Sequence, residues 1–391
     1  MRLSRGQHLA YSTNVHGDET WDEAFAALQF HTLAVRDRVC PRAPFAIGLR
    51  LSHRAAVELS DRQRFLEFQR WLAKNNCYVF TMNGFPYGRF QGARIKEQVY
   101  MPDWASPERL AYTNLLFDLL AQLVPAGVTG SISTLPGSFK EFDLHADALK
   151  AIRHHLWRCV EHVARVSEQS GRRLLLGLEP EPMCMLESSG EVIHCFDRLR
   201  AEHPRDPRLD EHLGLNYDTC HFAVGFEEPH DALPCLVQHG IKIVKIHLSS
   251  ALRVRPTPAA RAELKRFCDD AYLHQVVICQ AGGQRFIYRD LDDALICEPQ
   301  EPEEAAQNSE WRIHFHVPLH APAVPPLDNT NDHLLGVLDL LAESPELCPH
   351  LEMETYTWEV LSAELRSRSL AEQLAAEYDW TLARLKERGL A

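Results

Sequence analysis

The segment IKIVKIHLS, residues 241–249, has the pattern of a strand that is buried on both faces. Branched apolar residues dominate it, which favours an extended conformation. Counting in twos, Ile243, Lys245 and His247 share one side of the strand, and the alternating positions are valine and isoleucine. One side therefore packs against apolar neighbours, and the other carries a lysine and a histidine into the interior of the fold.

Seven further apolar runs resemble this segment, and longer stretches of helical period separate them. The runs are LAYSTN (9–14), FAIGLRLS (45–52), CYVFTMN (77–83), GVTGSIST (127–134), RLLLGLEP (173–180), HLGLNYD (212–218) and LEMETY (351–356). The helical stretches are roughly 20–39, 54–74, 107–124, 145–170, 190–203, 230–239 and 359–387. Strands that alternate with helices predict a parallel sheet, and eight such units predict a single (β/α)₈ TIM barrel. Periodicity leaves a doubly wound open sheet as the alternative.

Residues 250–345 are too long for the single helix expected before the last strand. They also hold LHQVVICQ (273–280), WRIHFHVP (311–318) and the acidic segment CEPQEPEE (297–304). We interpret them as a long insertion between strands seven and eight, with the acidic segment as an exposed loop, inside one barrel domain that spans residues 1–391. In the alternative, WRIHFHVP is the eighth strand and LEMETY is an added one. We favour the first arrangement.

Charge and cysteine content narrow the class of protein. The chain has 391 residues, with 41 Lys and Arg against 54 Asp and Glu, which gives a net charge of −13. This balance argues against nucleic acid or an anionic membrane as a partner. No apolar run is long enough to span a membrane, and no secretory signal is expected. Eleven cysteines without a C-x-x-C pair predict reduced thiols and a cytoplasmic protein.

Four polar residues stand at strand ends that a barrel brings together. Glu179, Asp218, His247 and Glu354 are each the last polar residue of a predicted strand on its inward side. In a barrel these ends meet at one mouth. Three carboxylates would repel one another there, and a divalent cation removes that conflict. The set suits Mn²⁺, Mg²⁺, Co²⁺ or Zn²⁺, so we predict a metal site, with Glu179 and Glu354 as candidate catalytic residues.

Other residues are candidates for an additional metal or for substrate contacts. They are His221 in DTCH, His314 and His316 in HFHVP, Lys245, Arg253, Asn83 and Arg50. His314 and His316 are two apart and face one side if the chain is extended. Lys245 lies one layer below His247, where it is either an ion-pair partner of a barrel carboxylate such as Glu352 or, with Arg253, a group that steadies an oxyanion.

The motifs LEPEP, NYDTCH, KIHLSS and ETYTW, in this order, resemble the strand ends of the xylose isomerase-like TIM-barrel superfamily. That superfamily includes sugar isomerases, ketose 3-epimerases and endonuclease IV-type enzymes. The resemblance implies that Glu179, Asp218, His247 and Glu354 are the metal ligands. It also matches His221 to the second residue of the Asp-x-x-His motif, and His314 and His316 to an extra ligand pair of the endonuclease IV type. That type also uses histidines at strands three and four, where this chain has Asn83 and Ser133.

More narrowly, TNVHGDETW, FTMNGFPYGRF, GSISTLPGSFK, LEPEPMCMLE and HFHVPLH resemble the EboE metabolite-traffic family across nearly the whole chain. The resemblance implies a role in a secondary-metabolite pathway, with operon-encoded partners or a homo-oligomer as expectations.

Three hypotheses for the function follow. The first is metal-assisted proton transfer on a small polyhydroxylated or carbonyl metabolite, as in sugar phosphate isomerases and epimerases. The second is a metal-dependent hydrolase in which His314 and His316 hold a second metal. The third is a protein that binds and passes on a metabolite without catalysis.

Overall fold

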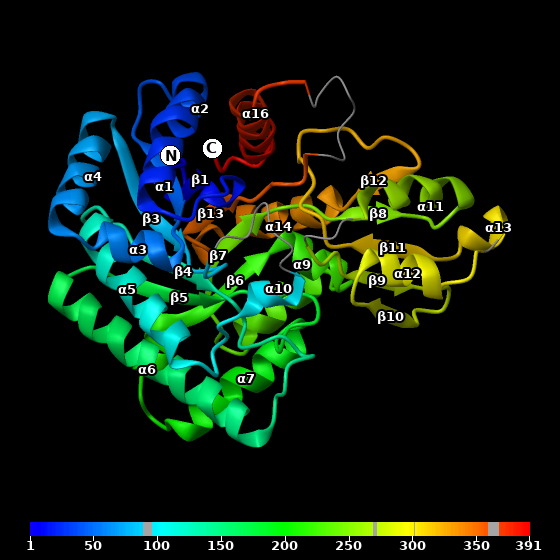
Figure 1. Cartoon of the computed structure of the whole chain (residues 1–391), viewed down its shortest axis with the longest axis horizontal. Helices are drawn as coiled ribbons and strands as arrows, with labels where there is room; N and C mark the ends of the chain where they lie inside the picture. The colour runs from blue at the N-terminus through cyan, green and yellow to red at the C-terminus, as the bar shows by residue number, and fades with distance from the viewer. Residues whose placement is uncertain (89–95, 269–271, 301, 359–366) are drawn as a thin grey trace.

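Eight parallel strands form a closed barrel in the computed structural model, which describes residues 1–88, 96–268, 272–300, 302–358 and 367–391 (Figure 1). The strands are β1 (His8–Tyr11), β2 (Phe45–Arg50), β3 (Cys77–Asn83), β4 (Gly130–Thr134), β5 (Leu174–Leu178), β6 (Leu213–Asp218), β7 (Ile243–Leu248) and β13 (His350–Met353). Their order is β1-β13-β7-β6-β5-β4-β3-β2, and a parallel bridge from Ser12 to Gly48 closes the ring. The predicted barrel is confirmed, and the open sheet is wrong.

Helices cover the outside of the barrel. They are α1 (Trp21–Ala27), the π-helix η2 (Leu28–Thr32), α2 (Leu33–Val39), α3 (His53–Leu59), α4 (Arg62–Lys74), α5 (Pro107–Leu123), α6 (Ala146–Ser170), α7 (Ser189–Glu202), α8 (Arg208–His212), α9 (Thr219–Val224), α10 (Pro229–Gln238), α14 (Asn331–Glu343) and α16 (Leu370–Glu387). Capping boxes begin α1, α7 and α16, at Thr20, Ser188 and Ser369. In each box the side chain of the capping residue and a glutamate three positions later satisfy backbone N–H groups that the helix leaves unpaired.

Most of the predicted elements are present, with shifts at their ends. The first strand ends at Tyr11 instead of residue 14, because Thr13–Val15 form the 3₁₀ helix η1. The stretch predicted as one helix over 54–74 is divided into α3 and α4, and Asp61 caps the second of them. Of the helix predicted over 359–387, residues 359–366 lie outside the described part of the chain, and α16 begins at Leu370.

The insertion between β7 and β13 forms a second sheet. Its strands are β8 (Leu252–Val254), β9 (Val276–Cys279), β10 (Arg285–Tyr288), β11 (Glu310–Ile313) and β12 (Leu327–Asn329), in the order β10-β9-β11-β8-β12, and all pairs are antiparallel. The helices α11 (Pro258–Leu264), α12 (Leu291–Cys297) and α13 (Glu303–Ala306) and the 3₁₀ turn η4 (Lys265–Phe267) accompany it. Figure 1 shows this sheet as a lobe beside the barrel.

The position of β11 decides between the two arrangements of the sequence. Residues 310–313 pair with β8 and β9 inside the insertion, whereas β13 pairs with β7 on one side and β1 on the other. LEMETY therefore supplies the eighth barrel strand, as favoured, and WRIHFHVP does not. The acidic segment 297–304 is not wholly a loop, because α12 ends at Cys297 and α13 begins at Glu303.

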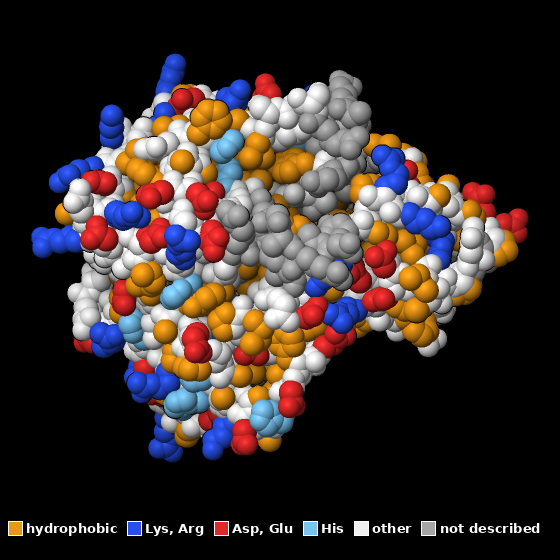
Figure 2. Space-filling view, viewed as in Figure 1, with side chains coloured by type: hydrophobic (Ala, Val, Ile, Leu, Met, Phe, Trp, Pro, Cys, Tyr) orange, Lys and Arg blue, Asp and Glu red, His pale blue; other side chains and the backbone are white. Residues whose placement is uncertain are grey.

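The buried apolar side chains form one large cluster in the barrel, a smaller one in the insertion around Trp311 and Ile278, and two minor ones, of which one joins Cys220 and Val224 of α9 to Val277 of β9. All eleven cysteines are free thiols, and seven of them are buried. In the described part of the chain, no helix has both the length and the apolar character needed to cross a membrane. On the face of the molecule seen in Figure 2, acidic and basic side chains are interspersed over the barrel helices.

Candidate metal centre

Four side chains meet at the carboxyl ends of neighbouring barrel strands. Glu179 follows β5 and Glu354 follows β13, while Asp218 ends β6 and His247 lies near the end of β7. One ligand atom from each lies within 4.8 Å of those of the other three, and we refer to these residues as the quartet. The structure thus brings together the four residues that the strand pattern selected. That they bind a metal stays a prediction.

The Nδ1 atom of His247 lies in the middle of the quartet. It is 2.8 Å from Oε1 of Glu179, 2.7 Å from Oε2 of Glu354 and 3.4 Å from Oδ2 of Asp218. Burial disfavours a charged imidazole, but Glu179 and Glu354 outweigh it and hold the pKa of His247 well above its usual value. Three carboxylates close together in a buried space repel one another, so a positive charge at this point stabilises them strongly.

Asp218 uses one of its two carboxylate oxygens within the protein. Oδ1 accepts hydrogen bonds from the backbone N–H groups of Cys220 and His221, at 2.7 and 3.0 Å, and from the hydroxyl of Ser249 at 2.7 Å. Oδ2 is buried and has no hydrogen-bond partner among the described residues. Its ion pair with Nδ1 of His247, at 3.4 Å, is too long for a good hydrogen bond. A buried carboxylate oxygen that accepts none costs free energy unless a cation satisfies it, so Asp218 fits a metal ligand.

A second layer of polar side chains lies beneath the quartet. Nζ of Lys245 is 2.7 Å from Oε2 of Glu352 and also donates to Oδ1 of Asn83 at 2.7 Å. Glu352 lies 3.2 Å from Nε2 of His247. A hydrogen bond from this Nε2 leaves Nδ1 facing the quartet, which is how carboxylates orient metal-binding histidines. The ion pair predicted between Lys245 and Glu352 is present, and Asn83 belongs to the same layer.

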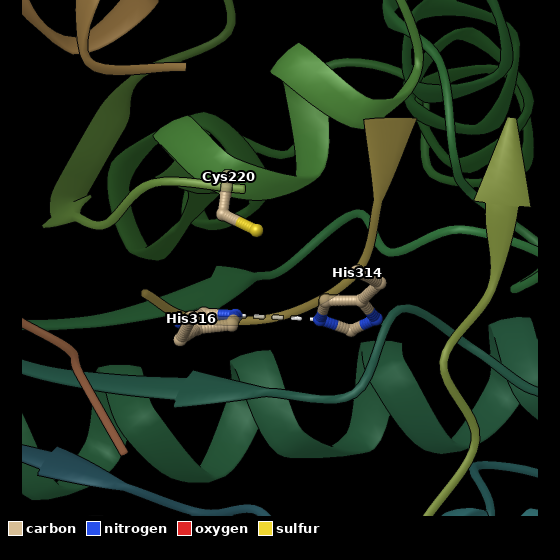
Figure 3. A group of neighbouring side chains, drawn as sticks. All are labelled: Cys220, His314 and His316. Carbon is tan, nitrogen blue, oxygen red and sulfur yellow. Dashed lines mark hydrogen bonds between the residues drawn. The ribbon is translucent and has the colours of Figure 1, made fainter. Parts of the chain in front are cut away.

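Three buried imidazoles form a second cluster next to the quartet, and we refer to His221, His314 and His316 as the histidine triad. Their Nε2 atoms are 3.1 Å apart for the first and second residues and 3.3 Å apart for the other two pairs. Figure 3 shows two of the rings, His314 and His316, with these nitrogens facing each other. Nitrogens held about 2.05 Å from a tetrahedral zinc ion are about 3.3 Å apart, so the spacing fits one ion.

The opposite ring nitrogens show which atoms carry protons. Nδ1 of His221 lies 2.8 Å from the carbonyl oxygen of Pro180, Nδ1 of His316 lies 3.0 Å from that of Glu354, and Nδ1 of His314 lies 2.8 Å from Oε1 of Gln275. All three oxygens can only accept, so each Nδ1 donates. In neutral rings the three Nε2 lone pairs then converge with no proton between them, which a cation would stabilise.

Burial and the two neighbouring imidazoles hold the pKa of His314 well below its usual value, so this ring is neutral. The pKa of Asp218 is held well below its usual range despite burial, because His221 and His316 lie close to it. Asp218 with His221 and His316 is itself a candidate ligand set. Asp218 thus adjoins both clusters.

Two further buried side chains lie within ligand distance of the triad. Glu181 forms a candidate set with His221 and His314, and Cys220, above the rings in Figure 3, forms one with His314 and His316. Burial, together with the charges of Glu179, Asp218 and Glu354, raises the pKa of Glu181 to about 8, although its hydrogen bond from Tyr100 opposes the shift. Near neutral pH the carboxyl group of Glu181 therefore holds a proton.

Two predicted residues do not reach this centre. Arg253 lies on β8, where its guanidinium donates to Asp328 and Asp332 at 2.9 and 2.7 Å. Arg50 is buried, and it donates to backbone carbonyl oxygens, including that of Asp18 at 2.6 Å. Neither lines the cavity described below. Arg253 is thus part of the insertion sheet. Arg50 connects β2 by hydrogen bonds to the loops that hold Asp18 and Pro86.

The sequence reasoning missed three residues at this centre. Asn14 donates to Oε1 of Glu354 at 2.7 Å, Glu181 adjoins the triad, and Gln275 accepts from His314. Glu181 follows Glu179 by two positions in LEPEP, so the rule that placed His314 and His316 on one side could have found it. Asn14 and Gln275 have no comparable local signal.

A cavity of about 560 Å³ opens above both clusters. Its floor holds Glu179, Glu354, His221 and His314, together with Asn14 and Asn83. Its walls come from the loops that follow β1, β3, β4 and β13 and from the insertion. A volume of this size holds a small organic molecule, and the candidate metal ligands lie where such a molecule would meet them.

No protein-family model matches the chain, and no curated protein matches it. Among solved structures, it resembles a xylose isomerase-like TIM-barrel protein from Mycobacterium smegmatis in complex with magnesium, with a TM-score of 0.53, 13% identity and 99% of each chain covered. It also resembles an L-ribulose 3-epimerase, with a TM-score of 0.49, 12% identity and 99% and 96% covered. A third is the IOLI protein with a bound zinc atom, with a TM-score of 0.49, 11% identity and 97% and 98% covered. Strand order, closure and the first of these likenesses show that the chain has the xylose isomerase-like TIM-barrel fold.

Proposed function

We propose that this protein is a divalent-metal-dependent isomerase or epimerase that moves a proton on a small hydroxy-carbonyl metabolite. The observation that carries the proposal is the quartet: two glutamates that line the cavity and a buried aspartate converge on Nδ1 of one buried histidine. A bound divalent cation acts as a Lewis acid on substrate oxygens and on water. Mn²⁺, Zn²⁺, Mg²⁺ and Co²⁺ all suit this set of ligands.

Residues around the quartet would transfer protons and orient the reacting groups. Glu179 and Glu354 both line the cavity and both contact Nδ1 of His247, so one can take a proton from a substrate carbon while the other returns one. Asn14 donates to Oε1 of Glu354 at 2.7 Å and so fixes the orientation of this carboxylate, whose Oε2 faces Nδ1 of His247. Glu181 lines the cavity beside His221 and His314, where its carboxyl group can exchange a proton with a substrate oxygen.

The test is solvent deuterium uptake by small ketoses and aryl hydroxyketones, with the metal-loaded protein and its Glu179→Gln and Glu354→Gln variants. We expect uptake to fall at least about a hundredfold in each variant, because general acid–base catalysis contributes about 10² to 10⁴. The metal content of each variant separates the loss of a base from the loss of a ligand. Glu202→Gln, in a surface ion pair with Arg153, is the control. Undiminished uptake in both variants would contradict the two-glutamate scheme.

The histidine triad supports a second candidate, a metal-dependent hydrolase with two ions. Its three Nε2 atoms converge at zinc spacing, and Asp218 lies between the triad and the quartet. Elemental analysis of the zinc-loaded protein and of a His316→Gln variant distinguishes this hydrolase from the proton-transfer enzyme. Two ions in the protein and one in the variant would favour hydrolysis, and one ion in both would leave proton transfer as the better candidate.

The resemblance of several motifs to the EboE family leads us to propose further that the substrate belongs to a secondary-metabolite pathway and that the protein works with operon-encoded partners or as a homo-oligomer. A non-catalytic role in passing on a metabolite is the competing reading. It predicts that quartet variants still bind ligand while the unaltered protein turns over no substrate in the deuterium assay.

A further inference from the structure

We infer that the substrate carries an aromatic or similarly apolar body on one side of its metal-binding oxygens, and that it is not a bare sugar. The inference rests on the proposed function, because it takes the quartet as the place where the substrate oxygens bind. What supports it is the division of the cavity into a polar floor and apolar walls.

The floor supplies the hydrogen-bonding groups. Glu179, Glu354, Glu181, His221, His314 and the two asparagines lie there. Most of these groups already have partners: Asn83 binds Lys245, Asn14 binds Glu354, and His314 binds Gln275. The floor therefore suits two or three substrate oxygens close to the metal ligands.

Apolar side chains form the walls, and they come from segments that are far apart in the sequence. Phe85 follows β3, Leu135 follows β4, Phe267 and Phe315 lie in the insertion, and Trp358 follows β13. Aromatic contacts hold several of them in place. Phe85 stacks on Tyr100 with 5.8 Å between ring centroids, and Phe267 meets Phe315 edge to face at 6.2 Å. The walls thus offer preformed flat surfaces for a ring.

The two cations that line the cavity are engaged with acidic partners. Nζ of Lys96 lies 2.6 Å from Oδ2 of Asp290, and Nη1 of Arg266 lies 2.7 Å from Oε1 of Glu263. Tyr100, Tyr272, His274, Tyr356 and Thr357 also line the described cavity, but aliphatic and aromatic side chains make up most of the lining above the floor. A chain of hydroxyl groups buried against such walls would lose its hydrogen bonds to water without replacement, whereas an aromatic ring would gain contact.

The test uses three hydroxamic acids that chelate a metal through the same two oxygens but differ in their bodies: acetohydroxamate, benzohydroxamate and 2-naphthohydroxamate. Their dissociation constants with the zinc-loaded, full-length protein are measured by calorimetry. Each buried methylene-sized group tightens binding about fourfold, so the naphthyl compound is expected to bind at least about a hundredfold more tightly than acetohydroxamate.

Variants of the walls identify where the ring binds. Phe85→Ala and Phe267→Ala are each expected to reduce the naphthyl advantage about tenfold and to leave acetohydroxamate binding unchanged. Phe286→Ala is the matched control, because Phe286 is also half-buried against the insertion core but does not line the cavity. Two variants on different segments keep the test valid if one of them fails to fold.

The outcomes separate the two proposals. A naphthyl advantage that both wall variants reduce supports the inference. Equal affinity for all three compounds, or an advantage that the wall variants leave intact, overturns it while the metal site stands. If no hydroxamate binds the zinc-loaded protein, or if Asp218→Asn binds all three as well as the unaltered protein does, the metal site itself fails and the inference fails with it.

Discussion

Gln275 fixes a single residue of the histidine triad in the orientation that a metal needs. Its Oε1 accepts from Nδ1 of His314 at 2.8 Å, while its Nε2 donates to the hydroxyl of Tyr100 at 2.9 Å and to the carbonyl oxygen of Pro182 at 3.3 Å. These two acceptors set the direction of the amide, and the amide sets the tautomer of His314. Gln275 is therefore a positioning residue, fully buried, that directs Nε2 of His314 toward the other two rings.

Replacing Gln275 by leucine is expected to weaken zinc binding at the triad by about ten- to a hundredfold, the usual effect of losing such a partner. Competition with a chromogenic chelator measures the affinity. Gln7→Leu is the matched control. Gln7 is equally buried, but it donates to the carbonyl oxygen of Pro345 and makes no hydrogen bond to the triad. Equal zinc affinity in both variants would show that the triad does not depend on this hydrogen bond.

His350 lies at the opposite end of the barrel, where β13 begins, and its burial predicts how the stability of the fold depends on pH. Burial, helped by the neighbouring His8, lowers its pKa from 6.5 to about 3. The folded-state pKa lies below the unfolded-state value, so the unfolded chain takes up a proton first as the pH falls. His350 therefore contributes its full stability above about pH 6.5, and this contribution declines as the pH falls toward 3.

The decline is expected to be about 1.4 kcal/mol for each pH unit below 6.5. His350→Gln keeps a polar group beside Ser131, to which Nδ1 of His350 lies at 2.7 Å, but removes the titration. Urea unfolding of both proteins at pH 7, 6 and 5 measures the difference, in which the other histidines largely cancel. We expect the stability of the unaltered protein to fall relative to the variant by about 2 kcal/mol between pH 6.5 and 5. A constant difference would contradict burial of a neutral ring.

At the scale of elements, the closure of the barrel between β1 and β2 depends on Gly48. A Cβ atom there would lie 1.8 Å from Oε1 of Glu352 and 3.0 Å from the carbonyl oxygen of Tyr11. Because Gly48 has no side chain, the buried carboxylate of Glu352 on β13 can pack directly against the backbone of β2. The ion pair of Glu352 with Lys245, which supports His247, is thus linked to barrel closure.

Gly48→Ala is expected to lower the free energy of unfolding by about 3 kcal/mol, because it must displace a buried charged group. Gly190→Ala in α7 is the control: no atom lies within 4 Å of its added Cβ, and alanine favours a helix, so this variant should keep or slightly raise stability. Denaturant unfolding of the two variants measures the contrast. Equal stability of the two would show that the strands near Gly48 readily move apart.

The strands and the quartet could be predicted because their signals are local. Alternation with period two fixes the side on which Glu179, Asp218 and His247 lie, and barrel geometry then brings the strand ends together. Asn14 could not be found in this way, since its contact with Glu354 joins positions 340 residues apart. Arg253, named as a group that could steady an oxyanion, does not line the cavity, because the chain enters the antiparallel sheet of the insertion at Leu252.

In the insertion, too, contacts between distant positions could not be predicted from local sequence patterns. Its apolar segments predicted that it contains regular structure, but antiparallel pairing of β11 with β8 and β9 is a long-range choice without a local signature. The register of β11 carries His314 and His316 out of the sheet and onto the barrel mouth, beside His221. The sequence named His221, His314 and His316 as candidates and placed the last two on one side, but it did not predict that the three rings converge.

At the scale of the whole molecule, the histidine triad connects two hydrophobic cores. His221 belongs to the barrel, at α9, whereas His314 and His316 follow β11 of the insertion, which has its own cluster around Trp311. Apart from the small cluster that joins α9 to β9, the insertion has its own core, so we expect it to open at a lower free energy than the barrel. An ion held by ligands from both parts would have to be released before the insertion opened.

Zinc is therefore expected to slow amide hydrogen exchange in β9 and β11 by up to about a hundredfold at a concentration a hundred times its dissociation constant, which corresponds to about 2.7 kcal/mol. β2, which carries no proposed ligand, should change little and is the internal reference. His314→Gln should lose the added protection, whereas His162→Gln, on the surface beside Asp118, should retain it. Equal zinc protection in the unaltered protein and His314→Gln would show that the triad does not hold the insertion to the barrel.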